Sequence, residues 1–197
     1  GLHSNNPPTI YTEDDEYELI DLDGASFYTT VMGNYGVCPP QFGEVFLEIL
    51  RELTAERLLA KKNKDTIKAN TLKITINSIY GKLGFEYGFL YRPSAMYKTT
   101  INGQLISLKL IENLSLAGIK CFYANTDGAT FKVKKSDIEL FYKICDEYSK
   151  EINVLLEFQK YKKCIIQNVN SYIIITSEDK IKEKGQFLTD TFDKDWT

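Results

Sequence analysis

The chain has 197 residues, 43% hydrophobic and 26% charged, which is typical of one globular domain or of one domain with an inserted lobe. No uncharged apolar run is long enough to span a membrane, and no basic-then-apolar start indicates a secretion signal. The four cysteines are widely spaced and there is one histidine, so we expect free thiols in a reducing compartment and no zinc site.

The net charge of −3 hides a strong asymmetry along the chain. Residues 11–23 hold seven acidic residues and no basic one, whereas residues 51–82 hold eight basic residues. A basic stretch of this kind can attract phosphates whatever the total charge. A solvated helix face is the alternative interpretation of the same pattern.

The first half of the chain predicts a loop, a strand and helices. Residues 1–12, with Pro7 and Pro8, predict a loop, and residues 17–23 predict a strand that ends at Asp23. A short segment over 26–32 follows. Apolar residues at helical spacing predict helices over 44–62 and 66–80, and Pro93 opens a long helix that ends near Gly118.

The second half is richer in predicted strands. Residues 120–124 and 129–133 flank a turn and predict a β-hairpin. A helix is expected from Ser136-Asp137 to about Ile152, followed by β-rich stretches over 155–167, 171–176 and 180–188. This order predicts an α+β fold, with helices on one face of an antiparallel sheet and a projecting helical hairpin.

Three segments carry chemistry. In the first, Asp21 to Tyr28, a carboxylate at a strand end followed by a tight turn can hold a divalent cation beside backbone N–H groups that face a phosphate. In the second, the helix over 73–81, Lys73, Asn77 and Tyr80 share one face. They present an ammonium, an amide and a ring that can stack on a base or sugar.

The third segment, Tyr123 to Gly128, places Asp127 at the tip of the predicted hairpin. Each segment also has an interpretation without function. The first can be a solvated carboxylate, the second an exposed helix face with no binding role, and the third an ordinary β-turn.

The three segments together resemble family-B DNA polymerases. The stretch KITINSIYG matches the family's K-x-x-x-N-S-x-Y-G motif, the turn at Asp127 resembles Y-x-D-T-D-[SG], and Asp23 fits D-x-x-S-[LF]-Y because Ser26, Phe27 and Tyr28 then fall in place. Asp21 does not fit. The resemblance implies an antiparallel palm sheet with packed helices, formed by residues 1–43 and 83–197, and an inserted two-helix fingers hairpin at 44–82.

The family's chemistry implies roles for these residues. Asp23 and Asp127 would be the catalytic carboxylates that bridge two Mg²⁺ ions, for which Mn²⁺ can substitute, with the Gly24 carbonyl as a further ligand. The predicted dNTP-binding residues are Ser26, Phe27, Tyr28, Arg57, Lys61, Lys73 and Asn77. Tyr28 would be the steric gate against a 2′-hydroxyl. The predicted template and primer contacts are Tyr80, Gly81, Asn125 and Tyr172.

The sequence departs from the family pattern at several positions. Asn125 replaces the first aspartate of the D-T-D turn, and Thr29-Thr30 replace Pro-Ser. The primer-gripping K-K-x-Y appears only as Val169 to Tyr172. Because Asp127 keeps the direct metal ligand, the resemblance implies that activity survives, and that an aspartate at position 125 would be accepted.

The implied reaction is DNA-templated addition of dNMP to a primer 3′-hydroxyl. Its partners would be primer-template DNA, dNTP, and the missing exonuclease and thumb segments of a parent or split polymerase, with no membrane. We expect weak or no activity from the isolated fragment. A phage-like source, acting in the host cytoplasm, fits the compact fingers.

Two other function classes stay open. A different palm-type polymerase, such as a reverse transcriptase, also uses two aspartates. A non-catalytic α+β nucleic-acid-binding module would stack bases on exposed aromatics, and the chain has 13 tyrosines.

Overall fold

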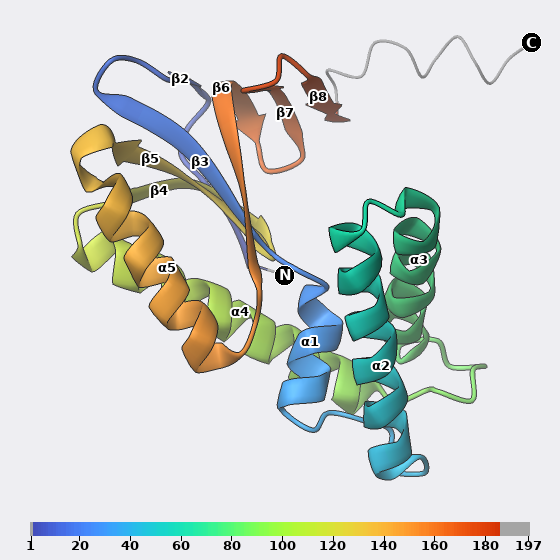
Figure 1. The fold of residues 1–197 in the computed structure, drawn as a ribbon. Coiled ribbons are helices and arrows are strands. Elements are labelled where there is room, and N and C mark those ends of the chain that lie inside the picture. Colours follow the sequence, from blue (N-terminus) through green and yellow to red (C-terminus); the bar gives the residue numbers. More distant parts are fainter. Residues whose placement is uncertain (1, 186–197) are drawn as a thin grey trace, which may run out of the picture. The chain divides into compact units, whose positions relative to one another are not determined.

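The computed structural model describes residues 2–185. In chain order its elements are β1 (Leu2–Asn5), β2 (Thr9–Thr12), β3 (Tyr17–Gly24), α1 (Phe27–Asn34), α2 (Gly43–Lys62), α3 (Thr66–Lys82), α4 (Pro93–Leu116), β4 (Lys120–Thr126), β5 (Gly128–Lys134), the 3-10 turn η1 (Lys135–Asp137), α5 (Ile138–Ile152), β6 (Leu156–Asn168), β7 (Ser171–Thr176) and β8 (Ile181–Lys184). Figure 1 shows these elements along the chain. The predicted α+β class is confirmed.

Most predicted elements are present, but the prediction of a loop at the N-terminus is wrong. Residues 1–12 were expected to lack regular structure, whereas β1 pairs antiparallel with β4 and β2 pairs antiparallel with β6. Pro7 and Pro8 lie between the two segments and indicate a loop, and each segment is only four residues long. Each becomes a strand by pairing with the edge of a longer strand that lies far away in the sequence.

The chain divides into two compact units. Unit 1 contains residues 1–23, 107–151 and those from 156 onward, and unit 2 contains residues 24–106 and 152–155. The predicted boundaries between palm and fingers, at 43/44 and 82/83, divide the chain by function, whereas these two units are defined by compactness. The palm and fingers boundaries therefore stay a prediction. The last predicted palm residues, 186–197, lie outside the described chain.

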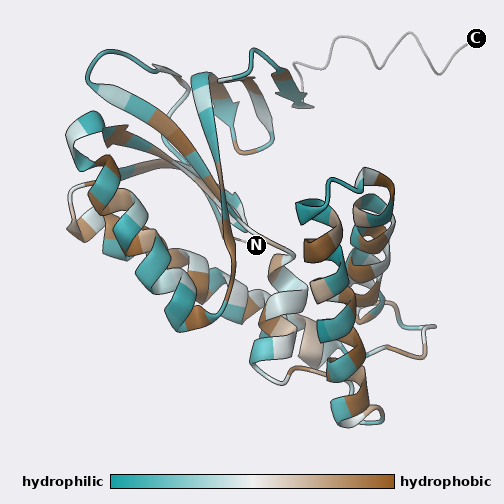
Figure 2. Cartoon of the chain, in the orientation of Figure 1, coloured by the Kyte–Doolittle hydropathy of each residue, from teal (hydrophilic) through white to brown (hydrophobic). Residues whose placement is uncertain are grey.

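Unit 1 is built on one sheet with the strand order β1-β4-β5-β3-β6-β7-β8, and β2 joins it through β6. Alternation along β3 places Leu19, Asp21 and Asp23 on one face and Ile20 and Leu22 on the other. In Figure 2, brown hydrophobic stretches run along the central strands. One face of β3 is therefore apolar, and the other combines a buried leucine with two aspartates.

Helix α5 covers the Ile20 face of the sheet. Its buried residues Phe141, Cys145 and Tyr148 recur at helical spacing. Phe141 meets Phe131 of β5, with ring centroids 5.6 Å apart, and Phe131 is the register partner of Ile20. The other face carries its own core around Leu19, Phe122 and Tyr161. Burial on both faces holds β3 and β5 rigidly in register.

Unit 2 is helical. Its core joins Met32 of α1, Leu50 of α2, Leu83 after α3 and Ala95 at the start of α4. Asp65 begins α3 by accepting a hydrogen bond from the Lys68 N–H at 3.0 Å, and Pro93 occupies the first position of α4. Local capping and buried apolar side chains together explain why the two predicted helices form a hairpin.

Candidate functional site

Asp23 and Asp127 lie on the same cavity of unit 1. Asp23 is the register partner of Gly128, the residue that follows Asp127 at the start of β5. The cavity has a volume of about 340 Å³, and Asn125 and Tyr172 line it as well. The structure therefore brings together four predicted site residues from β3, the β4–β5 turn and β7.

The turn that carries Asp127 has an unusual backbone. The Asp127 N–H donates to the Asn125 carbonyl at 2.9 Å, and Thr126 between them has φ of 65°. A β-branched residue seldom adopts a positive φ, because its Cβ crowds the backbone. Strain of this kind is retained where the surrounding structure requires one geometry, and here it accompanies Asp127 at the tip of the hairpin.

Asn125 is tied to the neighbouring strands through its amide group. Its Nδ2 donates to the Tyr123 hydroxyl at 3.0 Å and to the Val169 carbonyl at 3.3 Å, while its Oδ1 accepts from the Thr126 hydroxyl at 3.0 Å. Both functions of the amide are in use. A carboxylate at position 125 would supply the acceptor but not the donors.

Asp21 lines the same cavity and is more deeply held than Asp23. Its Oδ2 accepts from the Tyr161 hydroxyl at 2.6 Å and its Oδ1 from the Thr130 hydroxyl at 2.7 Å. Burial raises the pKa of Asp21 above its usual value, against the opposing effect of these two hydrogen bonds. Asp21 thus joins β3, β5 and β6 beneath Asp23.

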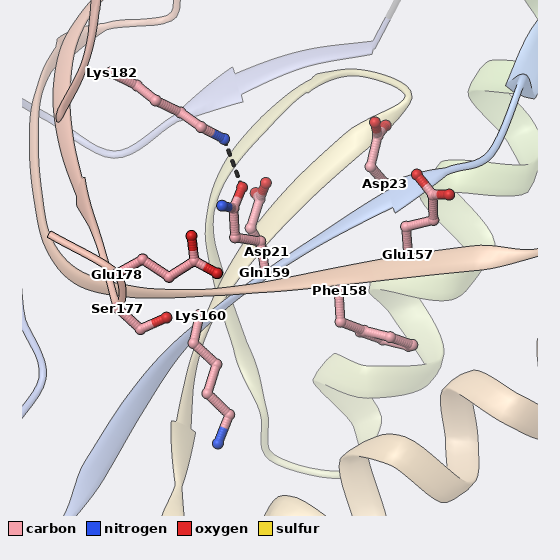
Figure 3. Close-up of a pocket in the computed structure, with 9 residues that line it drawn as sticks. All are labelled: Asp21, Asp23, Glu157, Phe158, Gln159, Lys160, Ser177, Glu178 and Lys182. Carbon is pink, nitrogen blue, oxygen red and sulfur yellow. Dashed lines mark hydrogen bonds between the residues drawn. The ribbon is translucent and has the colours of Figure 1, made fainter. Parts of the chain in front are cut away.

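A second cavity, of about 410 Å³, shares Asp21 and Asp23 with the first and adds Glu157 of β6. In Figure 3, Asp23 and Glu157 point to the same side, and Lys182 donates to Gln159 at 2.5 Å. Lys182 also lies 5.4 Å from the Tyr161 ring centroid. Carboxylates and a lysine therefore surround Asp23 from two strands.

Tyrosines form the opposite wall of the first cavity. Tyr123 and Tyr172 meet edge to face at 5.7 Å, and the Lys184 ammonium lies 5.9 Å from the Tyr172 ring centroid. The Tyr123 hydroxyl donates to the Val169 carbonyl at 2.9 Å, and burial raises its pKa to about 12. This wall is aromatic, neutral and close to a cation.

In unit 2, α1 begins at Phe27 with no side-chain cap on its first turn. The first N–H groups of a helix have no partner within it, and the Arg57 guanidinium donates to the Ser26 hydroxyl at this end. The Arg57 Nε is buried and has no hydrogen-bond partner. A Cβ on Gly24 would come within 2.4 Å of the Phe27 ring, so a glycine is required there.

Tyr28 and Tyr80 stack on each other, with centroids 4.6 Å apart and planes 12° from parallel. The Tyr80 hydroxyl lies 2.7 Å from the Thr100 hydroxyl of α4. Gly103 of α4 makes room for this arrangement, because a Cβ there would lie 2.9 Å from Phe27 and 3.2 Å from Tyr28. The predicted gate residue is therefore held in place by α3 and α4.

The other predicted residues of unit 2 lie on its surface. Lys73, Asn77 and Gly81 are exposed on α3, and Lys61 is exposed on α2. The structure thus groups the predicted residues into two sets, one within each unit, and Lys73 and Asn77 take part in neither the Arg57 nor the Tyr28 contact. Their roles stay predictions.

Sequence reasoning missed several residues of the first cavity. Asp21 was set aside because it does not fit the motif, although its place two residues before Asp23 on a strand puts both on one face. Tyr161, Thr130 and Glu157 had no local signal, since only strand pairing brings them to Asp21 and Asp23.

Metal-binding and membrane-spanning features are limited in the described part of the chain. Within residues 2–185, no group of three or more His, Cys, Asp and Glu side chains is arranged to hold a metal ion. In that same range, no helix is long and apolar enough to cross a membrane.

Known proteins similar to the chain are DNA polymerases. A DNA polymerase of Bombyx mori nuclear polyhedrosis virus is 27% identical over 219 aligned residues, which cover 83% of this chain and 22% of the viral protein. The mouse DNA polymerase alpha catalytic subunit is 22% identical over 129 residues, covering 62% of this chain and 9% of that subunit. The chain therefore spans less than a quarter of the length of either relative. No protein-family model matches it.

The fold is also that of a known polymerase. The structure of the family B DNA polymerase from the archaeon Pyrobaculum calidifontis superposes with a TM-score of 0.70 and 17% identity, covering 93% of this chain and 28% of that one. The chain thus has a polymerase fold. Its sequence relatives are DNA polymerases and its fold is similar to that of a family B DNA polymerase, in agreement with the resemblance that the three motifs carry.

Proposed function

We propose that the chain is the catalytic core of a DNA-templated DNA polymerase, which adds dNMP to a primer 3′-hydroxyl with the help of Asp23 and Asp127. One observation supports this most directly. Two carboxylates that were predicted from motifs far apart in the sequence line one cavity of unit 1. The names of the sequence relatives give the reaction class.

The donor chemistry around Asp23 fits Mg²⁺. This ion binds proteins through one or two carboxylates, with substrate phosphates and water completing its octahedron, rather than through a full protein cage. Two aspartates and the Gly24 carbonyl would hold it. Bound divalent ions would lower the pKa of the primer hydroxyl and neutralise the triphosphate.

The phosphate-binding role belongs to unit 2 in this proposal. The N-terminus of α1 favours negative charge, and the buried Arg57 Nε, which has no hydrogen-bond partner in the structure, can donate to a phosphate oxygen. Lys61 and Lys73 would add charge, and Ser26 and Phe27 would contribute backbone N–H groups. Asn77 would complete the nucleotide-binding set.

Tyr28 would act as the gate at the sugar. Its ring stacks on Tyr80 and packs next to Phe27 and Gly103, so a movement of the ring would break these contacts. Tyr80 and Gly81 would lie next to the nascent pair, and Asn125 and Tyr172 next to the primer. The proposal also includes a phage-like source and action in the cytoplasm of the host. Its partners would be the exonuclease and thumb segments of a parent or split polymerase.

The test is divalent-ion-dependent primer extension by the purified chain. We expect Asp127→Asn to lower extension by at least about 10²-fold, since it removes charge stabilisation of the transition state. Asp146→Asn, which changes an exposed aspartate of α5, serves as the matched control and should extend like the parent. If Asp127→Asn extends primers at the parent rate, the metal assignment is wrong.

A second readout covers a chain that is too weak to extend primers. Mn²⁺ binding in the presence of a dNTP, followed by electron paramagnetic resonance, should be weaker in Asp23→Asn and Asp127→Asn than in Asp146→Asn. A preference for RNA over DNA templates would indicate another palm-type polymerase. Nucleic-acid binding with no extension and no Mn²⁺ loss would indicate a binding module.

A further inference from the structure

A further cavity of unit 1 has a lining that includes three lysines and neither Asp21 nor Asp23. It has a volume of about 640 Å³, and its walls include Tyr17, Gly118, Lys120, Lys132, Lys134 and Asp137. The lining thus contains three lysines and one aspartate, and Asp14 and Glu16 lie next to Lys132 and Lys134. Volumes of this size accommodate small organic ligands.

The register places these lysines side by side on one face of the sheet. Lys120 of β4 lies directly opposite Lys132 of β5, and Lys134 lies two residues further along β5, beside Tyr17 of β3. Like charges in directly opposed positions destabilise a sheet. A repulsive pair of this kind indicates that something other than stability accounts for the lysines.

Lys132 and Lys134 each have one acidic neighbour outside the cavity lining. The ion pairs of Lys132 with Asp14 at 3.7 Å and of Lys134 with Glu16 at 3.9 Å are long and exposed, and such pairs contribute little. Asp14 is already engaged, because its carboxylate accepts the Glu16 and Tyr17 N–H groups at 2.9 and 2.7 Å. The Lys132 ammonium also makes a cation–π contact with Tyr17, at 4.3 Å from the ring centroid.

The lysines are not required to cap α4, which ends at this cavity. The carbonyls of Asn113, Leu114 and Ser115 accept backbone N–H groups of the turn that follows, at distances from 2.9 to 3.3 Å. The helix end is therefore satisfied by its own backbone. The positive charge is available to a ligand.

We propose that this lysine cavity is a binding site for phosphate groups, separate from the catalytic aspartates. Along β3, Tyr17 lies six residues from Asp23, or roughly 20 Å at the usual strand rise. The phosphate could belong to a free nucleotide or polyphosphate, or to a nucleic-acid strand. Both sources present the same oxyanions to Lys120, Lys132 and Lys134.

The test measures binding by the whole chain in EDTA, with Asp127→Asn as background, so that catalysis and its metals play no part. The two probes are sodium tripolyphosphate and a short single-stranded oligodeoxynucleotide, titrated by calorimetry. The variant Lys120→Ser/Lys132→Ser is compared with Lys143→Ser/Lys150→Ser, which removes the same charge from the exposed face of α5.

We expect the Lys120/Lys132 variant to weaken at least one probe about tenfold or more, because each lysine removed takes away a charge-assisted hydrogen bond. The α5 control should change affinity by less than twofold. Loss for tripolyphosphate identifies a small phosphate ligand, and loss for the oligonucleotide alone identifies a nucleic-acid strand. Equal loss in both variants, or no loss in either, overturns the proposal.

Lys120→Glu keeps the proposal testable if the double variant folds poorly. It replaces the repulsive pair with an attractive one, so the melting temperature should rise while probe binding falls. A rise in melting temperature with unchanged probe binding would overturn the proposal, because the lysines would then be solvent-exposed side chains of the sheet with no role in phosphate binding.

Discussion

Asp21 shows how much a single side chain depends on strands that are remote in sequence. Its two hydrogen bonds come from β5 and β6, and burial raises its pKa from the ordinary value of 3.8. Asp127 adds to this rise by repulsion, while Lys182 opposes it. The carboxyl group therefore holds its proton more tightly in the folded chain than in the unfolded one.

This shift predicts a pH-dependent stability. A carboxyl group whose pKa is raised on folding contributes most at or below pH 3.8, and its contribution is lost as the pH rises through the raised value. Asp21→Asn removes the ionisable group, and with it the loss of stability at higher pH. Thermal unfolding at a series of pH values should therefore show the variant gaining stability relative to the parent as the pH rises. A difference that is constant with pH would contradict the shift.

Asn125 has a structural role that the family motif does not indicate. The resemblance implies that an aspartate at this position leaves primer extension unchanged or improves it, which stays a prediction, but Nδ2 donates to both the Tyr123 hydroxyl and the Val169 carbonyl. We expect Asn125→Asp to destabilise the chain by about 1–3 kcal/mol, since it brings a carboxylate against the Val169 carbonyl oxygen, which then keeps only the Tyr123 hydroxyl as a donor. Urea unfolding measures this loss.

Asn168→Asp is the matched control for that variant. The Asn168 Oδ1 accepts the Asn170 N–H at 2.9 Å, a role that an aspartate keeps. It should therefore leave the free energy of unfolding close to that of the parent. Equal effects of both substitutions would mean that the amide of Asn125 is not needed.

At the scale of elements, α4 shapes the predicted nucleotide-binding side of unit 2. Its Gly103 allows Phe27 and Tyr28 of α1 to approach the helix closely, and Tyr28 in turn stacks on Tyr80 of α3. Three helices thus determine the position of one ring. The sequence motif contains Tyr28 and Tyr80, but nothing in it indicates Gly103.

Gly103→Ala should separate packing from helix propensity. In a helix this change ordinarily stabilises by up to about 1 kcal/mol, whereas here the new Cβ collides with two rings, at 2.9 and 3.2 Å. We expect a net loss of about 1–3 kcal/mol in urea unfolding, together with reduced discrimination against ribonucleotides in extension. The exposed Lys98→Ala on the same helix is the control, and a stabilised Gly103→Ala would refute the close packing.

At the scale of the whole molecule, the two units divide the proposed chemistry. Unit 1 contains the carboxylates and the lysine cavity, and unit 2 contains the α1 terminus, Arg57 and the stacked tyrosines. The net charge of −3 therefore says little about nucleic-acid binding, because positive groups are concentrated locally.

The sequence by itself determined the helices, most strands, the polymerase resemblance and the candidate residues Asp23, Asp127, Tyr28 and Lys73. These follow from local periodicity, turn residues and short motifs, which are properties of neighbours along the chain. Tertiary structure alone decided that residues 2–5 and 9–12 are strands, that Asp21 is bonded to Tyr161, and that Lys120 faces Lys132. The physical reason is that strand pairing joins residues far apart in the sequence, and no local pattern encodes which strands will meet.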